Sequence, residues 1–229
     1  MKKIFALMLM VLISCSTMLS AEEIKGQKPM MLIGETFQFV QGSWSRYFIH
    51  DKVKNEYYQM SIAILEKERR DWKDCSWMEV EIISENNPPV VTKFLAEETK
   101  EGPGDLKEVI VQVKGYSPFT VPGSFYEGKD KEVGDFKTAH VVKRIEKNLI
   151  NYKNKTLNVW KVEAQDPKGK TIDALISEEV LPIGVVMIES PESGMYLDDW
   201  GMNAKSRIEG TPLNFYIWLI HQTFDGIGQ

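Results

Sequence analysis

Short runs of β-branched and aromatic residues alternate along the chain with breaks that contain Pro, Gly, Asn or dense charge. Runs of this kind are typical of β-strands, and each type of break ends a strand for its own physical reason. The pattern therefore predicts an antiparallel meander. The runs are 44–50, 57–65, 75–83, 90–97, 108–114, 156–164, 171–177, 184–190 and 195–200.

In the second and third runs, apolar residues occupy every second position, so one face of the sheet is expected to be buried. The opposite face carries acidic residues and is expected to be wet, at least in part. A sheet of this kind needs a cover, which is another sheet, closure on itself or a helix. The apolar positions are Met60, Ile62, Ile64, Met78, Val80 and Ile82, and the opposite face has Trp77, Glu79 and Glu81.

A helix over about 212–224 is the predicted cover. Thr211 can cap its N-terminus, and Pro212 can take the first helical position, where a missing N–H costs nothing. The segment is apolar on nearly every side, which is typical of a buried helix, so we expect it to fill the hollow of a curved sheet. The alternative to a helix, for a run as short as this one, is a strand in the core.

A second helix is predicted over about 135–147, because Ala139, Val142, Ile145 and Leu149 fall near helical spacing. The fold class expected from these elements is mainly β (α+β), with a curved antiparallel meander, half-barrel or lipocalin-like, covered by the C-terminal helix.

The N-terminus predicts export. Lys2 and Lys3 precede an apolar run over 4–13 that has the length of a signal peptide and is too short to span a membrane. The tetrad "LISC" ending at Cys15 resembles the lipobox of bacterial lipoproteins. It indicates that Cys15 is the lipidated first residue of the mature chain, and the alternative is an ordinary cysteine inside a discarded leader.

The expected organisation is a signal peptide over 1–14, a tether over 15–35 and a single β-rich domain over 36–229. The tether is indicated by its mixture of charge, Gly and Pro. No break in composition marks a second domain. With 43% hydrophobic residues, the chain can bury a sizeable core.

A net charge of −5 argues against a nucleic-acid partner and against electrostatic docking on anionic lipid. The expected membrane contact is through acyl chains on Cys15, at about 0.8 kcal/mol for each buried methylene. The chain has 2 Cys. If Cys15 is lipidated, Cys75 is left without a partner for a disulfide.

No motif compels a particular chemistry. The three histidines, at 50, 140 and 221, do not have metal-ligand spacing, so neither a metal site nor a cofactor is expected. Cys75 could act as a nucleophile, although its neighbour Asp74 disfavours the thiolate. The adjacent acids Asp198 and Asp199 are expected to point to opposite faces of a strand. No catalytic residue is assigned.

The segment "LPIGVVMIESPESGMYLDDWG", residues 181–201, together with the meander and the terminal aromatic helix, resembles the bacterial envelope proteins that share the fold of the lipoprotein carriers LolA and LolB. The resemblance implies an open, strongly curved sheet lined with apolar side chains, whose hollow accepts acyl chains. Here the helix stands at the C-terminus, which departs from that group.

These observations predict a non-enzymatic exported lipoprotein that binds or carries an apolar or lipid-like ligand, on the periplasmic side of the outer membrane. Without lipidation it would be soluble in the periplasm. The alternatives are an envelope structural or interaction protein without a ligand, whose protein partner is unknown, and a Cys75-dependent hydrolase. The residues expected near a pocket are Trp77, Trp160, Phe215 and Trp218, because rigid aromatics give large contact areas.

Overall fold

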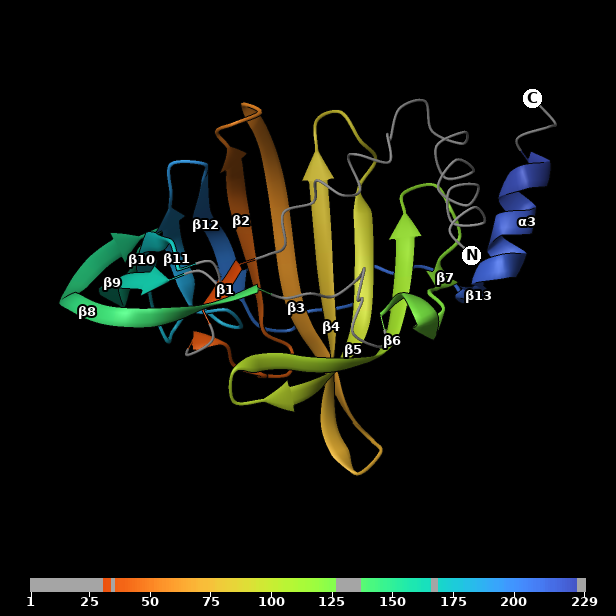
Figure 1. Cartoon of the computed structure of the whole chain (residues 1–229), viewed down its shortest axis with the longest axis horizontal. Helices are drawn as coiled ribbons and strands as arrows, with labels where there is room; N and C mark the ends of the chain where they lie inside the picture. Colours follow the sequence, from red (N-terminus) through yellow and green to blue (C-terminus); the bar gives the residue numbers. More distant parts are fainter. Residues whose placement is uncertain (1–30, 34–35, 127–136, 166–168, 226–229) are drawn as a thin grey trace.

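The computed structural model of the protein is built around one large sheet (Figure 1). It describes residues 31–33, 36–126, 137–165 and 169–225. A 3-10 helix, η2 (Gly123–Phe125), and an α-helix, α3 (Phe215–Asp225), accompany the strands. The strands are β1 (Met31–Ile33), β2 (Trp44–Asp51), β3 (Glu56–Arg70), β4 (Lys73–Ser84), β5 (Val90–Thr99), β6 (Gly102–Val113), β7 (Phe119–Thr120), β8 (Lys137–Tyr152), β9 (Lys155–Gln165), β10 (Thr171–Ile176), β11 (Val185–Glu189), β12 (Ser193–Gly201) and β13 (Leu213–Asn214).

The sheet joins two meanders. Its strand order is β1-β8-β9-β10-β11-β12-β2-β3-β4-β5-β6-β7-β13. The neighbours from β8 to β7 are antiparallel, whereas β1 pairs with β8, and β13 with β7, in parallel. No pairing joins β1 to β13 in the described part of the chain, so the sheet is open. The predicted mainly-β class with a curved antiparallel sheet is confirmed, in its half-barrel form.

The inner, concave face of the sheet holds the main core. Figure 1 shows β8 and β9 running across the direction of β3, β4 and β5, so that the two ends of the sheet face a common interior. Fully buried side chains from both ends belong to one apolar cluster, among them Ile62, Met78, Val162 and Val185. The alternation predicted for the runs at 57–65 and 75–83 is therefore confirmed on this face.

The predicted helix over 135–147 is wrong, because residues 137–147 belong to the long strand β8. Two bulges explain the misleading spacing: the pairing of β8 with β9 skips one residue between Val141 and Lys143 and another between Arg144 and Glu146. Each extra residue shifts the alternation by one, which imitates the spacing of a helix. The skipped residues, Val142 and Ile145, are both exposed.

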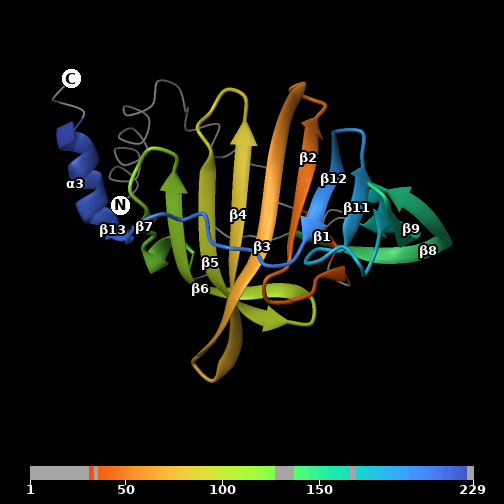
Figure 2. The ribbon, with the colours of Figure 1, turned by 180° about the vertical axis from the view of Figure 1, so that it is seen from behind.

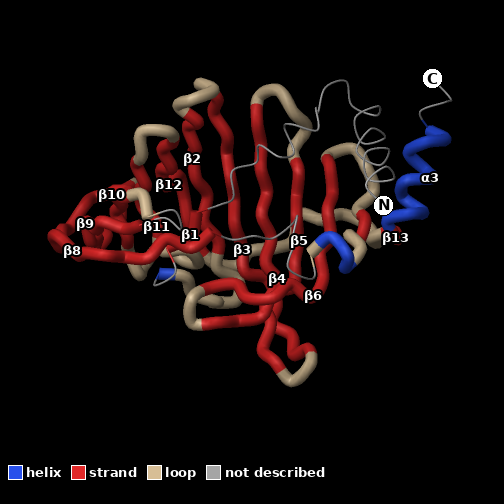
Figure 3. Tube along the Cα trace, viewed as in Figure 1, coloured by secondary structure: helices blue, strands red, loops and turns tan. Residues whose placement is uncertain are grey.

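The C-terminal helix exists but does not fill the hollow. α3 lies at the end of the sheet, beyond β7 and β13 (Figure 3). Phe215 and Trp218 are buried there, whereas Tyr216 and Ile220 are 62% and 54% exposed. The helix therefore covers only the end of the sheet, and the expectation that it is buried on every side is wrong.

The start of α3 also differs from the prediction. Leu213 and Asn214 form β13, which pairs with β7 and delays the helix until Phe215. The side-chain oxygen of Asn214 accepts a hydrogen bond of 3.0 Å from the backbone N–H of Tyr216, which caps the first turn. Asn214, not Thr211, is thus the capping residue.

The first described strand, β1, precedes residue 36, the predicted start of the β-rich domain. β1 lies inside the range predicted as a tether, and the side chain of Ile33 is fully buried. The hydroxyl of Thr36 bonds the carbonyl oxygens of Ile33 at 2.9 Å and Ile183 at 2.6 Å, which ties the entry of the chain to the loop before β11. Cys15 and the predicted signal peptide lie outside the described residues.

Candidate functional site

The four aromatic residues predicted near a pocket lie in three separate places. Trp77 is on the outer, convex face, in a small cluster with Leu65 and Leu95, and its indole N–H donates to Glu68 Oε2 at 3.0 Å. Trp160 packs at the margin of the main core, with the guanidinium of Arg144 5.5 Å from its ring centroid. The structure does not bring these two residues together.

Phe215 and Trp218 do share one cluster. Their ring centroids are 6.3 Å apart, and Phe119 of β7 lies 4.3 Å from Trp218 and 5.6 Å from Phe215. Trp218 is 6% exposed, and its indole N–H has no hydrogen-bond partner among the described residues. This cluster fastens α3 to the end of the sheet.

A half-buried apolar strip crosses the concave face beside the main core. Ile82, Val90 and Val113 are paired in register across β4, β5 and β6. Val80 and Val111 flank Thr92 in the adjacent row. All five apolar side chains keep part of their surface exposed, although they continue the face that is fully buried at Met78. We call these five residues the concave strip.

The convex face is crossed by an irregular segment over 202–210, the strap, which connects β12 to β13 (Figure 2). Its path explains why Trp77 and Glu79, predicted on a wet face, are both buried. Ala204 and Ile208 of the strap pack against the cluster that contains Trp77. Sequence reasoning did not identify the strap, because it has no periodicity.

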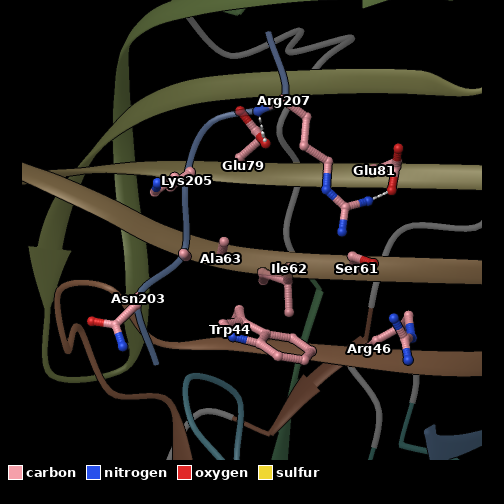
Figure 4. Close-up of a pocket in the computed structure, with 11 residues that line it drawn as sticks. Trp44, Arg46, Ser61, Ile62, Ala63, Glu79, Glu81, Asn203, Lys205 and Arg207 are labelled. Carbon is pink, nitrogen blue, oxygen red and sulfur yellow. Dashed lines mark hydrogen bonds and ion pairs between the residues drawn. The ribbon is translucent and has the colours of Figure 1, made fainter. Parts of the chain in front are cut away.

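Glu79 holds the strap on the sheet. Its two carboxylate oxygens accept hydrogen bonds from the backbone N–H of Arg207 at 2.8 Å and from the hydroxyl of Ser206 at 2.6 Å. The guanidinium of Arg207 pairs with Glu81, the next outward-facing residue of β4 (Figure 4). A buried carboxylate needs such partners, since an unpaired charge is costly away from water.

Arg46 organises a second charged group on the convex face. Its guanidinium contacts Asp198 at 2.6 Å and Asp199 at 3.7 Å. The expectation that these adjacent acids diverge is wrong, because a bulge between Leu197 and Asp199 interrupts the alternation of β12. Burial acts to raise the pKa of Asp198, but hydrogen bonds from Lys153 and Arg46 outweigh it and lower the pKa.

Cys75 is fully buried next to Trp77, and burial raises the pKa of its thiol. The thiol donates to the carbonyl oxygen of Lys73 at 3.7 Å. A protonated, buried thiol is a poor nucleophile. We expect native protein at pH 8 to react with iodoacetamide at least ~100-fold more slowly than protein in denaturant, because access requires opening of the fold.

Mass spectrometry of alkylated peptides would measure both rates for Cys75. Equal rates in native and denatured protein would contradict the buried, protonated state of this thiol.

No group of three or more His, Cys, Asp and Glu residues that could hold a metal ion occurs in the described ranges. The histidines are dispersed: His50 stacks on Tyr57 of the neighbouring strand at 4.3 Å, and His140 and His221 are exposed on β8 and α3. Among the helices that the structure describes, none has the length and hydropathy needed to cross a membrane.

Comparison with known proteins gives no family. No family model matches the chain, and no curated protein sequence matches it. Among solved structures, a "putative lipoprotein" from Parabacteroides distasonis ATCC 8503 is 14% identical, with 74% of this chain and 99% of that one covered and a TM-score of 0.33. A DUF1329 family protein from Desulfovibrio piger ATCC 29098 is 12% identical, with 69% and 83% covered and a TM-score of 0.31. Likeness at this level does not define the function of the chain.

Proposed function

We propose that the protein is a non-enzymatic exported lipoprotein that binds an apolar, lipid-like ligand on the concave face of its sheet. The observation that carries this proposal is the concave strip, whose apolar side chains are only half-buried on the inner face of an open sheet. The expected lipidation of Cys15 would hold the protein at the membrane that supplies such a ligand.

The geometry of the strip suits a hydrocarbon chain. Neighbouring strands are about 4.8 Å apart, so the in-register row of Ile82, Val90 and Val113 forms a continuous apolar track across three strands. A chain lying on this track gains about 25 cal/mol for each Å² of apolar surface removed from water. The track continues toward β3 and β2 through Met60 and Tyr47, which are buried.

The predicted role of the C-terminal helix, which is to fill the hollow, has no part in this proposal, because α3 contacts β13 and β7 at the end of the sheet. The ligand instead covers side chains that are already partly exposed. Binding then requires no displacement of α3 from the cluster formed by Phe119, Phe215 and Trp218.

To test the proposal, the exported protein carrying Cys15→Ser would be purified from the periplasm without detergent and examined by native mass spectrometry, followed by lipid extraction. Stoichiometric lipid is the expected result. A clean apo mass, together with no binding of added phospholipid or fatty acid, would contradict the proposal.

A matched pair of substitutions locates the ligand. Ile82 and Ile83 are neighbours in β4, both half-buried, and point to the concave and convex faces respectively. Ile82→Asn is expected to weaken lipid binding at least about tenfold, because it places an amide without a partner against hydrocarbon. Ile83→Asn should leave binding unchanged. Fluorescent fatty-acid titration measures both, and equal loss in the two variants would exclude the concave strip as the site.

The alternative, an interaction protein without a ligand, is favoured by the outer edge of β8. In the described chain, β1 pairs only with Lys137–Ala139, which leaves the remainder of this edge open. An open edge can accept an extended segment of another protein. Crosslinking in cells, followed by capture of the protein, tests this alternative, and recovery of no specific partner would count against it.

A further inference from the structure

The middle of β8 is exposed on both faces of the strand. Every one of the eight side chains from Val142 to Leu149 is exposed. The position of β8 explains this exposure, because β1 covers its outer edge only at Lys137–Ala139 within the described ranges. Figure 1 shows β8 and β9 at the end of the molecule opposite α3. We call residues 142–149 the exposed stretch.

This end of the sheet is positively charged, although the chain as a whole is acidic. Residues 139–165 hold six Lys or Arg and two Glu, in a chain whose net charge is −5. Each of these glutamates lies opposite a lysine of the neighbouring strand. Glu163 is in register with Lys143, and Glu146 is in register with Lys161. The net charge, which argues against docking on anionic lipid, therefore averages over a local excess of cations.

Two further cations of the exposed stretch lie beside one indole. Arg144 and Lys147 are in register with uncharged residues, Val162 and Trp160 respectively. The guanidinium of Arg144 is 5.5 Å from the ring centroid of Trp160, and the ammonium of Lys147 is 5.7 Å from it. An indole ring attracts cations at such distances. The positive charge is thus gathered around a half-buried aromatic side chain.

Three large aliphatic side chains are interspersed with these cations. Val142 and Ile145 are the residues that the two bulges of β8 leave unpaired, and a bulge re-aims the side chains of its strand. Leu149 lies two positions after Lys147, on the same face of the strand. All three are exposed. Exposed aliphatic groups that cluster in this way mark an interaction surface.

We propose that the exposed stretch docks the protein on the surface of an anionic bilayer. Arg144 and Lys147 would pair with lipid phosphates. Trp160 would lie at the level of the headgroups, where an indole has both apolar and polar surroundings. Ile145 and Leu149 would enter the outermost part of the hydrocarbon. Affinity for such a surface increases with the apolar area that is buried and with attraction to anionic headgroups.

A strand of another protein fits this stretch less well. An added strand needs a regular ladder along β8, which the bulges at 142 and 145 interrupt. A bilayer surface requires no register. The expected acyl chains on Cys15 would keep the protein near a bilayer, so that even a weak surface contact would determine which end of the sheet faces the membrane.

Co-sedimentation of the purified Cys15→Ser protein with lipid vesicles tests the proposal. Phosphatidylethanolamine vesicles with about one quarter phosphatidylglycerol should bind the protein at least about tenfold more tightly than phosphatidylcholine vesicles at low salt. About 0.5 M NaCl should remove most of this preference by screening. Equal binding to the two kinds of vesicle would overturn the proposal. Absence of binding to either would also overturn it, and would leave the exposed stretch to a protein partner.

A pair of double variants tests the cations. Arg144→Gln/Lys147→Gln is expected to weaken binding to the phosphatidylglycerol vesicles at least about tenfold, because each cation near an anionic surface contributes about fivefold. Lys100→Gln/Lys114→Gln is the matched control, since both lysines are exposed, lie outside β8 and β9, and change the net charge equally. Equal loss in the two double variants would overturn the proposal, because net charge alone would then control binding.

Leu149→Asn tests the aliphatic contact without a change in charge. It is expected to weaken vesicle binding at least about threefold, because it removes apolar surface that the bilayer would cover. Val53→Asn is its control, since Val53 and Leu149 are 70% and 68% exposed. Both variants should keep the thermal midpoint of the wild type. Unchanged vesicle binding of Leu149→Asn would contradict insertion of this side chain.

Ile82→Asn separates this docking surface from the concave strip. Its preference for anionic vesicles should be unchanged, because Ile82 is on β4 and not on β8. Vesicle preference without lipid in the purified protein would reject the proposed function alone. Bound lipid without vesicle preference would reject the docking surface alone.

Discussion

Gly184→Ala is expected to lower the free energy of unfolding by about 2–4 kcal/mol, from a left-handed backbone penalty and from overpacking together. Gly184 has a φ of +67°, and a methyl group there would overlap the side chain of Thr36 and lie 2.9 Å from its carbonyl oxygen. Thr36 cannot move away freely, because its hydroxyl holds the carbonyl oxygens of Ile33 and Ile183.

Gly169→Ala is the matched control for this prediction. Gly169 has a φ of +77° but no heavy atom of a described residue within 4 Å of the added methyl group. It should therefore lose only about 1 kcal/mol, from the backbone conformation. Urea unfolding followed by tryptophan fluorescence measures both variants. Equal destabilisation would show that contact with Thr36 does not matter, and that the backbone conformation alone restricts residue 184.

Glu79→Ala is expected to release the strap from the convex face and to cost about 3–6 kcal/mol of stability. It removes two hydrogen bonds to a charged group, each worth about 1.5–3 kcal/mol. Glu79 is 4% exposed, so water replaces these bonds poorly. Ser206 and the backbone N–H of Arg207 would lose their acceptor.

Limited proteolysis reports the release directly. Cleavage within 202–210 should become faster in the Glu79→Ala protein than in the wild type. Glu66→Ala serves as the control, because Glu66 is exposed and, within the described ranges, pairs only with Lys93, at 3.0 Å. Its surface ion pair should contribute less than about 1 kcal/mol. Unchanged cleavage of the strap in Glu79→Ala would show that apolar packing of Ala204 and Ile208 suffices to hold it.

The two faces of the sheet differ in what their chemistry can recognise. The concave face offers a track of aliphatic side chains, whereas the convex face carries the charged groups around Glu79, Glu81 and Arg46. Because side chains alternate along a strand, β4 contributes to both faces with consecutive residues. A single-residue slip in its register would exchange the two surfaces.

Much of the sheet could be predicted from sequence because alternation is a local signal. Where pairing is regular, as for Met60, Ile62 and Met78, every second apolar residue is on the buried face. Where bulges occur, the same signal misleads. The bulges in β8 give the apolar residues a spacing like that of a helix. The bulge in β12 allows both Asp198 and Asp199 to contact Arg46.

The sequence by itself determined the strand-rich class, the separation of strands by turns and the alternation of faces, because each depends on residues near one another in the chain. Tertiary structure alone decided that α3 lies at the end of the sheet, that the strap covers Glu79, and that the four predicted aromatics occupy three places. These outcomes depend on contacts between distant segments, such as residues 79 and 207. The stabilising energy of such contacts becomes available only after the sheet has formed, and no local sequence pattern specifies which distant segments will meet.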